Sequence, residues 1–221
     1  MTEEQILDFD LDNIFPEPLG QTPDGKRIFI DNGKLLYIQK VHRTAIEKCL
    51  GVDLIYNFID EHRLLFIQYK CLTDENKFYK SSDKHFPEEL KRMKSIPGIS
   101  DCNNFTVKRK ENLRLCGCPV FIKLSAREIK GRRKTPYSFY YPICIWDFIY
   151  SSKYKKYITL DDQPRISNEH FIDLVKAGLL GSLPNQSKDI NYYLIENSKD
   201  DRLKLIFGEC KVNNGNLTKI N

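Results

Sequence analysis

Three polar side chains interrupt apolar stretches of the chain in a way that suits phosphate-ester chemistry. Asp53 lies in the run Val-Asp-Leu-Ile-Tyr, and Gln68 and Lys70 lie in the run Phe-Ile-Gln-Tyr-Lys-Cys. Hydrolysis of a phosphodiester calls for oxygen ligands that hold a hard divalent cation and for a positive group that stabilises the charge on phosphorus. Because polar groups inside apolar strands need a partner or a metal, we expect these three residues to form one metal-dependent centre.

The strands that carry these residues are predicted to form a hairpin. Residues 52–58 and 63–71 are rich in branched and aromatic side chains, and the polar segment 59–62 separates them. A turn centred between residues 60 and 61 pairs residues whose numbers sum to 121. Asp53 then lies directly across from Gln68, and the two share one face of the sheet.

Two neighbours extend the expected centre. Alternation along the second strand puts Lys70 on the face of the amide and turns Tyr69 to the opposite side. The apolar spacing over residues 41–50 favours a helix that Gly51 would end, and Glu47 lies on this helix. If the end of the helix packs over the hairpin, Glu47 reaches the same space.

In chain order, this segment contains Glu47, then Gly51-Val52-Asp53, then Phe66-Ile67-Gln68-Tyr69-Lys70. This order resembles the PD-(D/E)XK (restriction-endonuclease-like) nuclease superfamily, in its variants that have Glu, Gly-x-Asp and Gln-x-Lys. The resemblance covers a small part of the 221 residues. It implies an α/β fold with a restriction-endonuclease-like core, in which helices flank a mixed central sheet. It also implies metal-dependent cleavage of nucleic acid, usually DNA.

The resemblance assigns a role to each residue of the motif. It implies that Asp53 is the main ligand of Mg²⁺ or Mn²⁺, that the backbone carbonyl of Tyr69 completes the coordination, and that Glu47 is an additional ligand or lies just outside the coordination sphere. Gln68 stands where the superfamily more often has Glu or Asp, and a neutral amide binds a cation more weakly. Lys70 would orient the attacking water or stabilise the transition-state charge.

Two alternatives remain open for this segment. Such short patterns also arise by chance in hairpins, where Asp is often only a strand-entry residue. The chain would otherwise be a catalytically decayed module of the same fold that binds nucleic acid or protein, with Gln68 as a sign of decay. The sequence lacks a Ser-His-Asp order and a Gly-rich phosphate loop, which disfavours other hydrolases and kinases. No catalytic role is assigned to the scattered histidines, which are His42, His62, His85 and His170.

The seven cysteines are an odd number, and the polar N-terminus is unlike an export signal, so we expect reduced thiols. Cys102, Cys116 and Cys118, with Cys71 or His85 as a fourth ligand, would form a structural Zn²⁺ site. Packing alone also explains cysteines in apolar surroundings. Without a run of 18 apolar residues, no membrane segment is expected, and the protein is predicted to be cytoplasmic.

The net charge of +5 permits a polyanionic partner without identifying one. Two basic runs suit phosphate contacts, although charge runs are often only solvated faces; they are Lys108-Arg109-Lys110 and Arg132-Arg133-Lys134. The expected partner is DNA, with RNA not excluded. The resemblance further implies a restriction or anti-phage defence role, with a homodimer or a defence-system partner subunit.

The remaining elements would position this centre within a single nuclease domain over residues 27–212. An irregular, Pro- and Gly-rich arm is expected over 1–26, and a loose polar tail over 213–221. The other predicted elements are strands at 27–30 and 35–38 joined by an Asn-Gly turn, a helix at 87–93, strands at 119–124 and at 138–148 with a break at Pro142, and a helix from Ser167 to Leu179.

Overall fold

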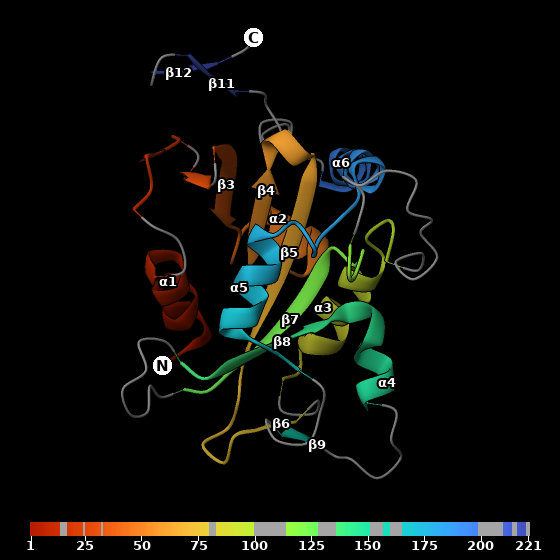
Figure 1. Cartoon of the computed structure of the whole chain (residues 1–221). Helices are drawn as coiled ribbons and strands as arrows, with labels where there is room; N and C mark the ends of the chain where they lie inside the picture. The colour runs from red at the N-terminus through yellow and green to blue at the C-terminus, as the bar shows by residue number, and fades with distance from the viewer. Residues whose placement is uncertain are drawn as a thin grey trace.

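A mixed sheet of eight strands forms the centre of the molecule in the computed structural model (Figure 1). The structure describes residues 1–13, 17–23, 25–31, 33–79, 83–99, 114–127, 136–150, 157–159, 165–198, 210–213 and 216–219. In sheet order, the strands are β1 (Gly20–Gln21), β2 (Arg27–Asp31), β3 (Lys34–Lys40), β4 (Leu54–Phe58), β5 (Arg63–Cys71), β7 (Val120–Ser125), β8 (Ser138–Pro142) and β10 (Ile166–Ser167). Only β5 and β7 pair in parallel. The predicted α/β class with a mixed central sheet is confirmed.

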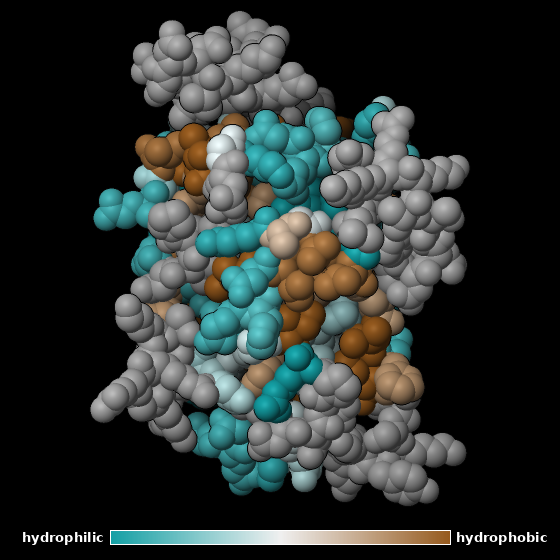
Figure 2. All heavy atoms as spheres, in the orientation of Figure 1, coloured by the Kyte–Doolittle hydropathy of each residue, from teal (hydrophilic) through white to brown (hydrophobic). Residues whose placement is uncertain are grey.

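Helices cover both faces of this sheet. One face carries α1 (Glu3–Asn13) and α5 (Asn168–Lys176), and the other carries α2 (Ala45–Leu50), α3 (Phe86–Lys94), α4 (Trp146–Tyr150) and α6 (Pro184–Ser198). Successive residues of β5 alternate between the two cores: Leu64 and Phe66 face α2 and α3, whereas Leu65 and Ile67 face α1 and α5. On the latter side, the outer surface of α5 is hydrophilic (Figure 2).

Short elements complete the fold. The strands β6 (Lys77–Tyr79) and β9 (Tyr157–Thr159) pair with each other below the main sheet in the view of Figure 1. The described residues also form two 3₁₀ turns, η1 (Ile59–Glu61) and η3 (Ile143–Ile145). Near the C-terminus, β11 (Cys210–Asn213) and β12 (Asn216–Lys219) form a separate hairpin. The tail predicted to be loose from residue 213 thus contains β12.

Both predicted hairpins are present. Strands β4 and β5 pair from Leu54↔Ile67 to Phe58↔Arg63, each pair summing to 121 as expected from the sequence. Strands β2 and β3 pair up to Asp31↔Lys34, and the αL φ of 77° at Gly33 suits the predicted turn. The first of these registers places residue 53 opposite residue 68.

The prediction of an irregular arm over residues 1–26 is wrong, because α1 begins at Glu3. Its start has reciprocal bonds between Thr2 and Gln5: Gln5 N donates to Thr2 Oγ1 at 3.2 Å, and Thr2 N donates to Gln5 Oε1 at 2.8 Å. The buried Asp10 anchors the helix through an ion pair with Lys123 and a 2.9 Å bond from the Tyr69 hydroxyl. These two bonds form a capping box, which the sequence Thr2-Glu3-Glu4-Gln5 could have indicated. The Pro- and Gly-rich composition of residues 1–26 instead favoured the prediction of an irregular segment.

Two other predicted elements have different bounds. The helix expected over 41–50 begins only at Ala45, because Arg43 has a φ of 61° and Thr44 caps the helix by accepting from Glu47 N. The strand expected over 138–148 ends at Pro142, which lacks the N–H needed to continue the ladder, and η3 and α4 follow. The helix α6 was not predicted.

Candidate functional site

Asp53 lies directly before β4 and is only 2% exposed. Its backbone N–H donates to the carbonyl of Ile67 at 2.9 Å, and its Oδ2 accepts from Tyr69 N at 2.8 Å. The β4–β5 register places Asp53 across from Gln68, on the face that carries α2 and α3. The predicted position of Asp53 relative to the hairpin is therefore the one the structure shows.

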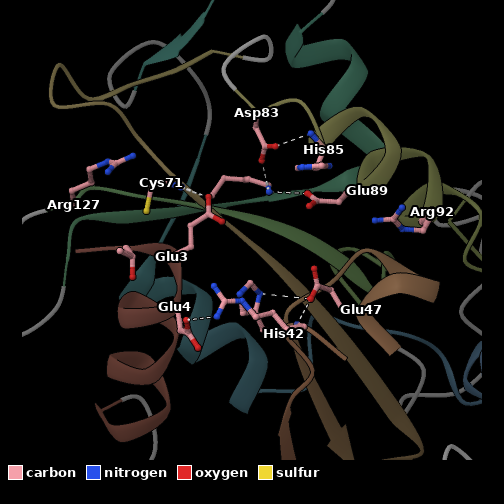
Figure 3. A pocket seen from close by; sticks show the side chains of 13 residues that line it. Glu3, Glu4, His42, Glu47, Cys71, Asp83, His85, Glu89, Arg92 and Arg127 are labelled. Atoms are coloured by element: carbon pink, nitrogen blue, oxygen red, sulfur yellow. Dashed lines mark hydrogen bonds and ion pairs between the residues drawn. The ribbon is translucent and has the colours of Figure 1, made fainter. Parts of the chain in front are cut away.

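Two more potential metal ligands, His42 and Glu47, point toward each other (Figure 3), and both lie close to Asp53. His42 Nδ1 lies 2.8 Å from Asp53 Oδ1 and 3.7 Å from Glu47 Oε2. One ligand atom from each of the three residues lies within 4.8 Å of the other two. The hydrogen bond to Asp53 raises the pKa of His42 above its ordinary value of 6.5. A carboxylate pair with an imidazole is a donor set that can hold a divalent cation.

Local backbone pairing explains why these residues meet. The β3–β4 ladder continues past Lys40↔Leu54, because Val41 N donates to the carbonyl of Asp53 at 2.8 Å. This bond brings His42, the next residue, beside the Asp53 side chain. The Thr44 cap then starts α2 so that its first turn carries Glu47 towards the same point.

Gly51 fixes the other end of α2. It has a left-handed φ of 71°, and its N–H caps the helix by donating to the Glu47 carbonyl. A Cβ at Gly51 would lie 2.7 Å from the carbonyl oxygen of Glu89, so only glycine lets the chain pass this close to α3. Gly51 thus lets the end of α2, which carries Glu47, pack closely against α3, which carries the Glu89 partner of Lys70.

Lys70 lines the same cavity, but its charge is already neutralised. Its Nζ lies 2.6 Å from Asp83 Oδ2 and 2.7 Å from Glu89 Oε2, and its side chain is 3% exposed. Burial lowers the pKa of Lys70, but the charges of Glu3 and Glu89 and the bond to Asp83 outweigh it, so the net shift is upward. The sequence predicted neither of these two direct partners.

Gln68 and Tyr69, the other two predicted metal ligands, lie next to each other on β5, with side chains on opposite faces of the sheet. Gln68 is 2% exposed, and its Nε2 lies 3.4 Å from the Tyr69 carbonyl oxygen. Within the described part of the chain, the buried Gln68 Oε1 has no hydrogen-bond partner. The Tyr69 side chain points to the opposite face, as predicted, where its hydroxyl binds Asp10. The amide oxygen is therefore an acceptor that a cation or a cation-bound water would satisfy.

The cavity at this site has a volume of about 840 Å³ and a mixed charge. The start of α1 forms one wall, where Glu3 Oε1 accepts from Cys71 N at 3.1 Å. Arginine side chains reach it from three separate segments, namely Arg43, Arg92 and Arg127. Guanidinium groups suit phosphate oxygens, so the cavity combines a place for a cation with places for phosphates.

Two of the expected zinc ligands, Cys71 and Cys118, lie far apart in the structure. By the parallel β5–β7 register, Cys71 is level with Ser125 and Phe66 with Val120, so Cys71 lies roughly 16 Å along the strands from the end near Cys118, at about 3.3 Å per residue. Cys102 lies outside the described residues. One ion therefore cannot bind Cys71 and Cys118 together, and His85 lines the cavity on the Cys71 side.

Cys116 instead packs beside Cys144, with 3.9 Å between their sulfurs. Hydrogen bonds from Cys118 and Cys144 lower the pKa of Cys116. Cys144 lies in an apolar segment of the sequence, so it was expected only to pack in the core.

Both basic runs expected to contact nucleic acid, 108–110 and 132–134, lie outside the described residues. Among the described helices, none is long and apolar enough to cross a membrane.

Comparisons with known proteins leave the chain unassigned. No family model, no curated protein and no solved structure matches it.

Proposed function

We propose that this chain is a divalent-metal-dependent nuclease that hydrolyses phosphodiester bonds in DNA. The observation that carries the proposal is the convergence of Glu47 and Asp53, with His42, within 4.8 Å beside a cavity that Lys70 also lines. The mixed sheet with helices on both faces is the arrangement that a restriction-endonuclease-like core implies, and it supports the proposal.

Each residue of the site would have a separate role. Asp53 and Glu47 would hold Mg²⁺ or Mn²⁺, with Gln68 Oε1 as a weaker donor on the same sheet face. The ion would supply a Lewis acid for the phosphate and would lower the pKa of a bound water. Arg92 would hold a phosphate of the substrate backbone, since its guanidinium-bearing side chain lines the cavity.

Lys70 would act on the charge that grows on the phosphate oxygens. For this, its ammonium group must exchange Asp83 or Glu89 for a phosphate oxygen when the substrate enters. The cavity around it is partly open to solvent, so the substrate would approach without unfolding of the sheet.

A cleavage assay tests this function. Purified protein is incubated with plasmid, linear duplex, single-stranded DNA and RNA, with Mg²⁺, with Mn²⁺ or with EDTA. We expect metal-dependent cleavage of DNA by the wild type, and none by Asp53→Asn. The control variant is Asp173→Asn, an exposed carboxylate of α5 on the opposite face, which should cleave normally. Equal cleavage by both variants would refute the site.

One observation favours a second function. Lys70 forms ion pairs with two carboxylates, so its charge is not free to act on a substrate unless one of them moves. The chain would then be a non-catalytic module that binds nucleic acid or protein. DNA binding that persists in EDTA, without cleavage over long incubation, would favour this alternative.

A further inference from the structure

His42 distinguishes this centre from a site built of oxygen ligands alone. It is 2.8 Å from Asp53 Oδ1 and 3.7 Å from Glu47 Oε2, both measured from Nδ1. Two ligand atoms at right angles around one ion, each at about 2.1 Å from it, are about 3 Å apart. The two observed separations bracket this value. Because all three ligand atoms also lie within 4.8 Å of one another, a single ion can take all three after small side-chain rotations.

The burial of the three side chains fits an ion that enters from the cavity. The Asp53 side chain is 3% exposed, whereas the side chains of His42 and Glu47 are 17% and 19% exposed and line the cavity. When His42 Nδ1 binds the ion, it gives up its proton and its hydrogen bond to Asp53 Oδ1, and that carboxylate oxygen is then available to the cation. The approach of an ion to Asp53 thus passes His42.

Gln68 gives a second, independent sign of a ligand here. Its Oε1 is buried on the same sheet face, across from Asp53, and has no hydrogen-bond partner in the described part of the chain. A buried amide oxygen without a partner costs stability unless something satisfies it. An ion or an ion-bound water at the His42 cluster would do so.

The chemistry of the donors decides which ion fits. Mg²⁺ and Ca²⁺ take oxygen ligands, whereas imidazole suits borderline transition metals, for which affinity rises from Mn²⁺ towards Co²⁺ and beyond. We propose that His42 is a ligand of the ion and that it makes the centre select a borderline transition-metal ion, such as Mn²⁺ or Co²⁺, over Mg²⁺. The inference rests on the proposed metal-dependent function, because one ion would serve both.

Metal binding without any nucleic acid tests this inference. Titration calorimetry with Mn²⁺, Co²⁺ and Mg²⁺ compares the wild type with His42→Ala. We expect the variant to bind Mn²⁺ and Co²⁺ about 10- to 100-fold more weakly and to bind Mg²⁺ within about threefold of the wild type. His42→Asp, which makes the site all-oxygen, should narrow the preference for Mn²⁺ over Mg²⁺. The visible spectrum of bound Co²⁺ should change in both variants.

The matched control is His170→Ala, which removes a histidine on α5 at the opposite face and should bind every ion as the wild type does. Wild-type affinity for Mn²⁺ and Co²⁺ in His42→Ala would overturn the inference, as would an unchanged Mn²⁺ to Mg²⁺ ratio in His42→Asp. Failure of the nuclease proposal looks different. In that case His42-dependent metal binding is present, but no nucleic acid is cleaved under any of the metals.

Discussion

Replacing Lys70 with Met should destabilise the fold and not only impair chemistry. The substitution keeps the apolar stem but leaves the carboxylates of Asp83 and Glu89 without their shared cation. Removing one partner of a buried ion pair costs about 3–5 kcal/mol. The cost should be near the lower end, because Asp83 keeps its bonds from the N–H groups of His85 and Phe86.

The pH dependence of this loss follows from Glu89. Burial already raises the pKa of Glu89, and loss of the Lys70 charge would raise it further. When a carboxyl group has a higher pKa in the folded state than in the unfolded state, the folded state becomes more stable as the pH falls through the folded pKa. The destabilisation of Lys70→Met should therefore shrink between pH 7.5 and pH 5, and the added substitution Glu89→Gln should recover about half of it at pH 7.5.

Guanidinium unfolding followed by circular dichroism measures these free energies. The control is Lys91→Met on the exposed side of α3, which should change stability by less than about 0.5 kcal/mol. If Lys70→Met is as stable as Lys91→Met at both pH values, the ion pairs described for Lys70 do not hold the fold together. Loss of cleavage in Lys70→Met would then report on chemistry alone.

Three further predictions follow from neighbouring contacts. In the metal-free protein, NMR titration should give His42 a pKa above 6.5, and Asp53→Asn should lower this pKa. The stability that the pair contributes is present below pH 6.5 and is lost as the pH rises through the folded pKa. An unchanged His42 pKa in Asp53→Asn would contradict the pairing. Gly51→Ala should cost about 2–4 kcal/mol in denaturant unfolding, through its positive φ and the close Glu89 carbonyl, and a neutral effect would disprove this close approach. Lys123→Met should lower the free energy of unfolding by about 3–5 kcal/mol because it leaves the buried Asp10 carboxylate without its cation. Wild-type stability of this variant would show that the ion pair does not anchor α1.

The sequence was sufficient to predict the hairpin that carries Asp53 and Gln68. The polar break at 59–62 marks the turn, and alternation then determines the register and the shared face, since both are local properties of two adjacent strands. Glu47 reached its predicted place because α2 is short and ends at Gly51, which leaves its first turn close to Asp53.

His42 could not be identified in the same way. Its place beside Asp53 depends on the β3–β4 ladder, which the predicted helix over 41–50 concealed. The partners of Lys70 were missed for a similar reason: the helix α3 was predicted, but its docking, which brings in Asp83 and Glu89, is a long-range property. Such contacts between distant segments have no local pattern in the sequence.

Anomalous scattering from crystals soaked in Mn²⁺ tests the central claim most directly. We expect one strong peak beside the cavity, with Asp53 and Glu47 among its ligands at about 2.2 Å. The peak should be absent from crystals of Asp53→Asn soaked in the same way. A wild-type crystal with no peak at Asp53, or with the same peak in Asp53→Asn, would contradict a metal-dependent centre at this site.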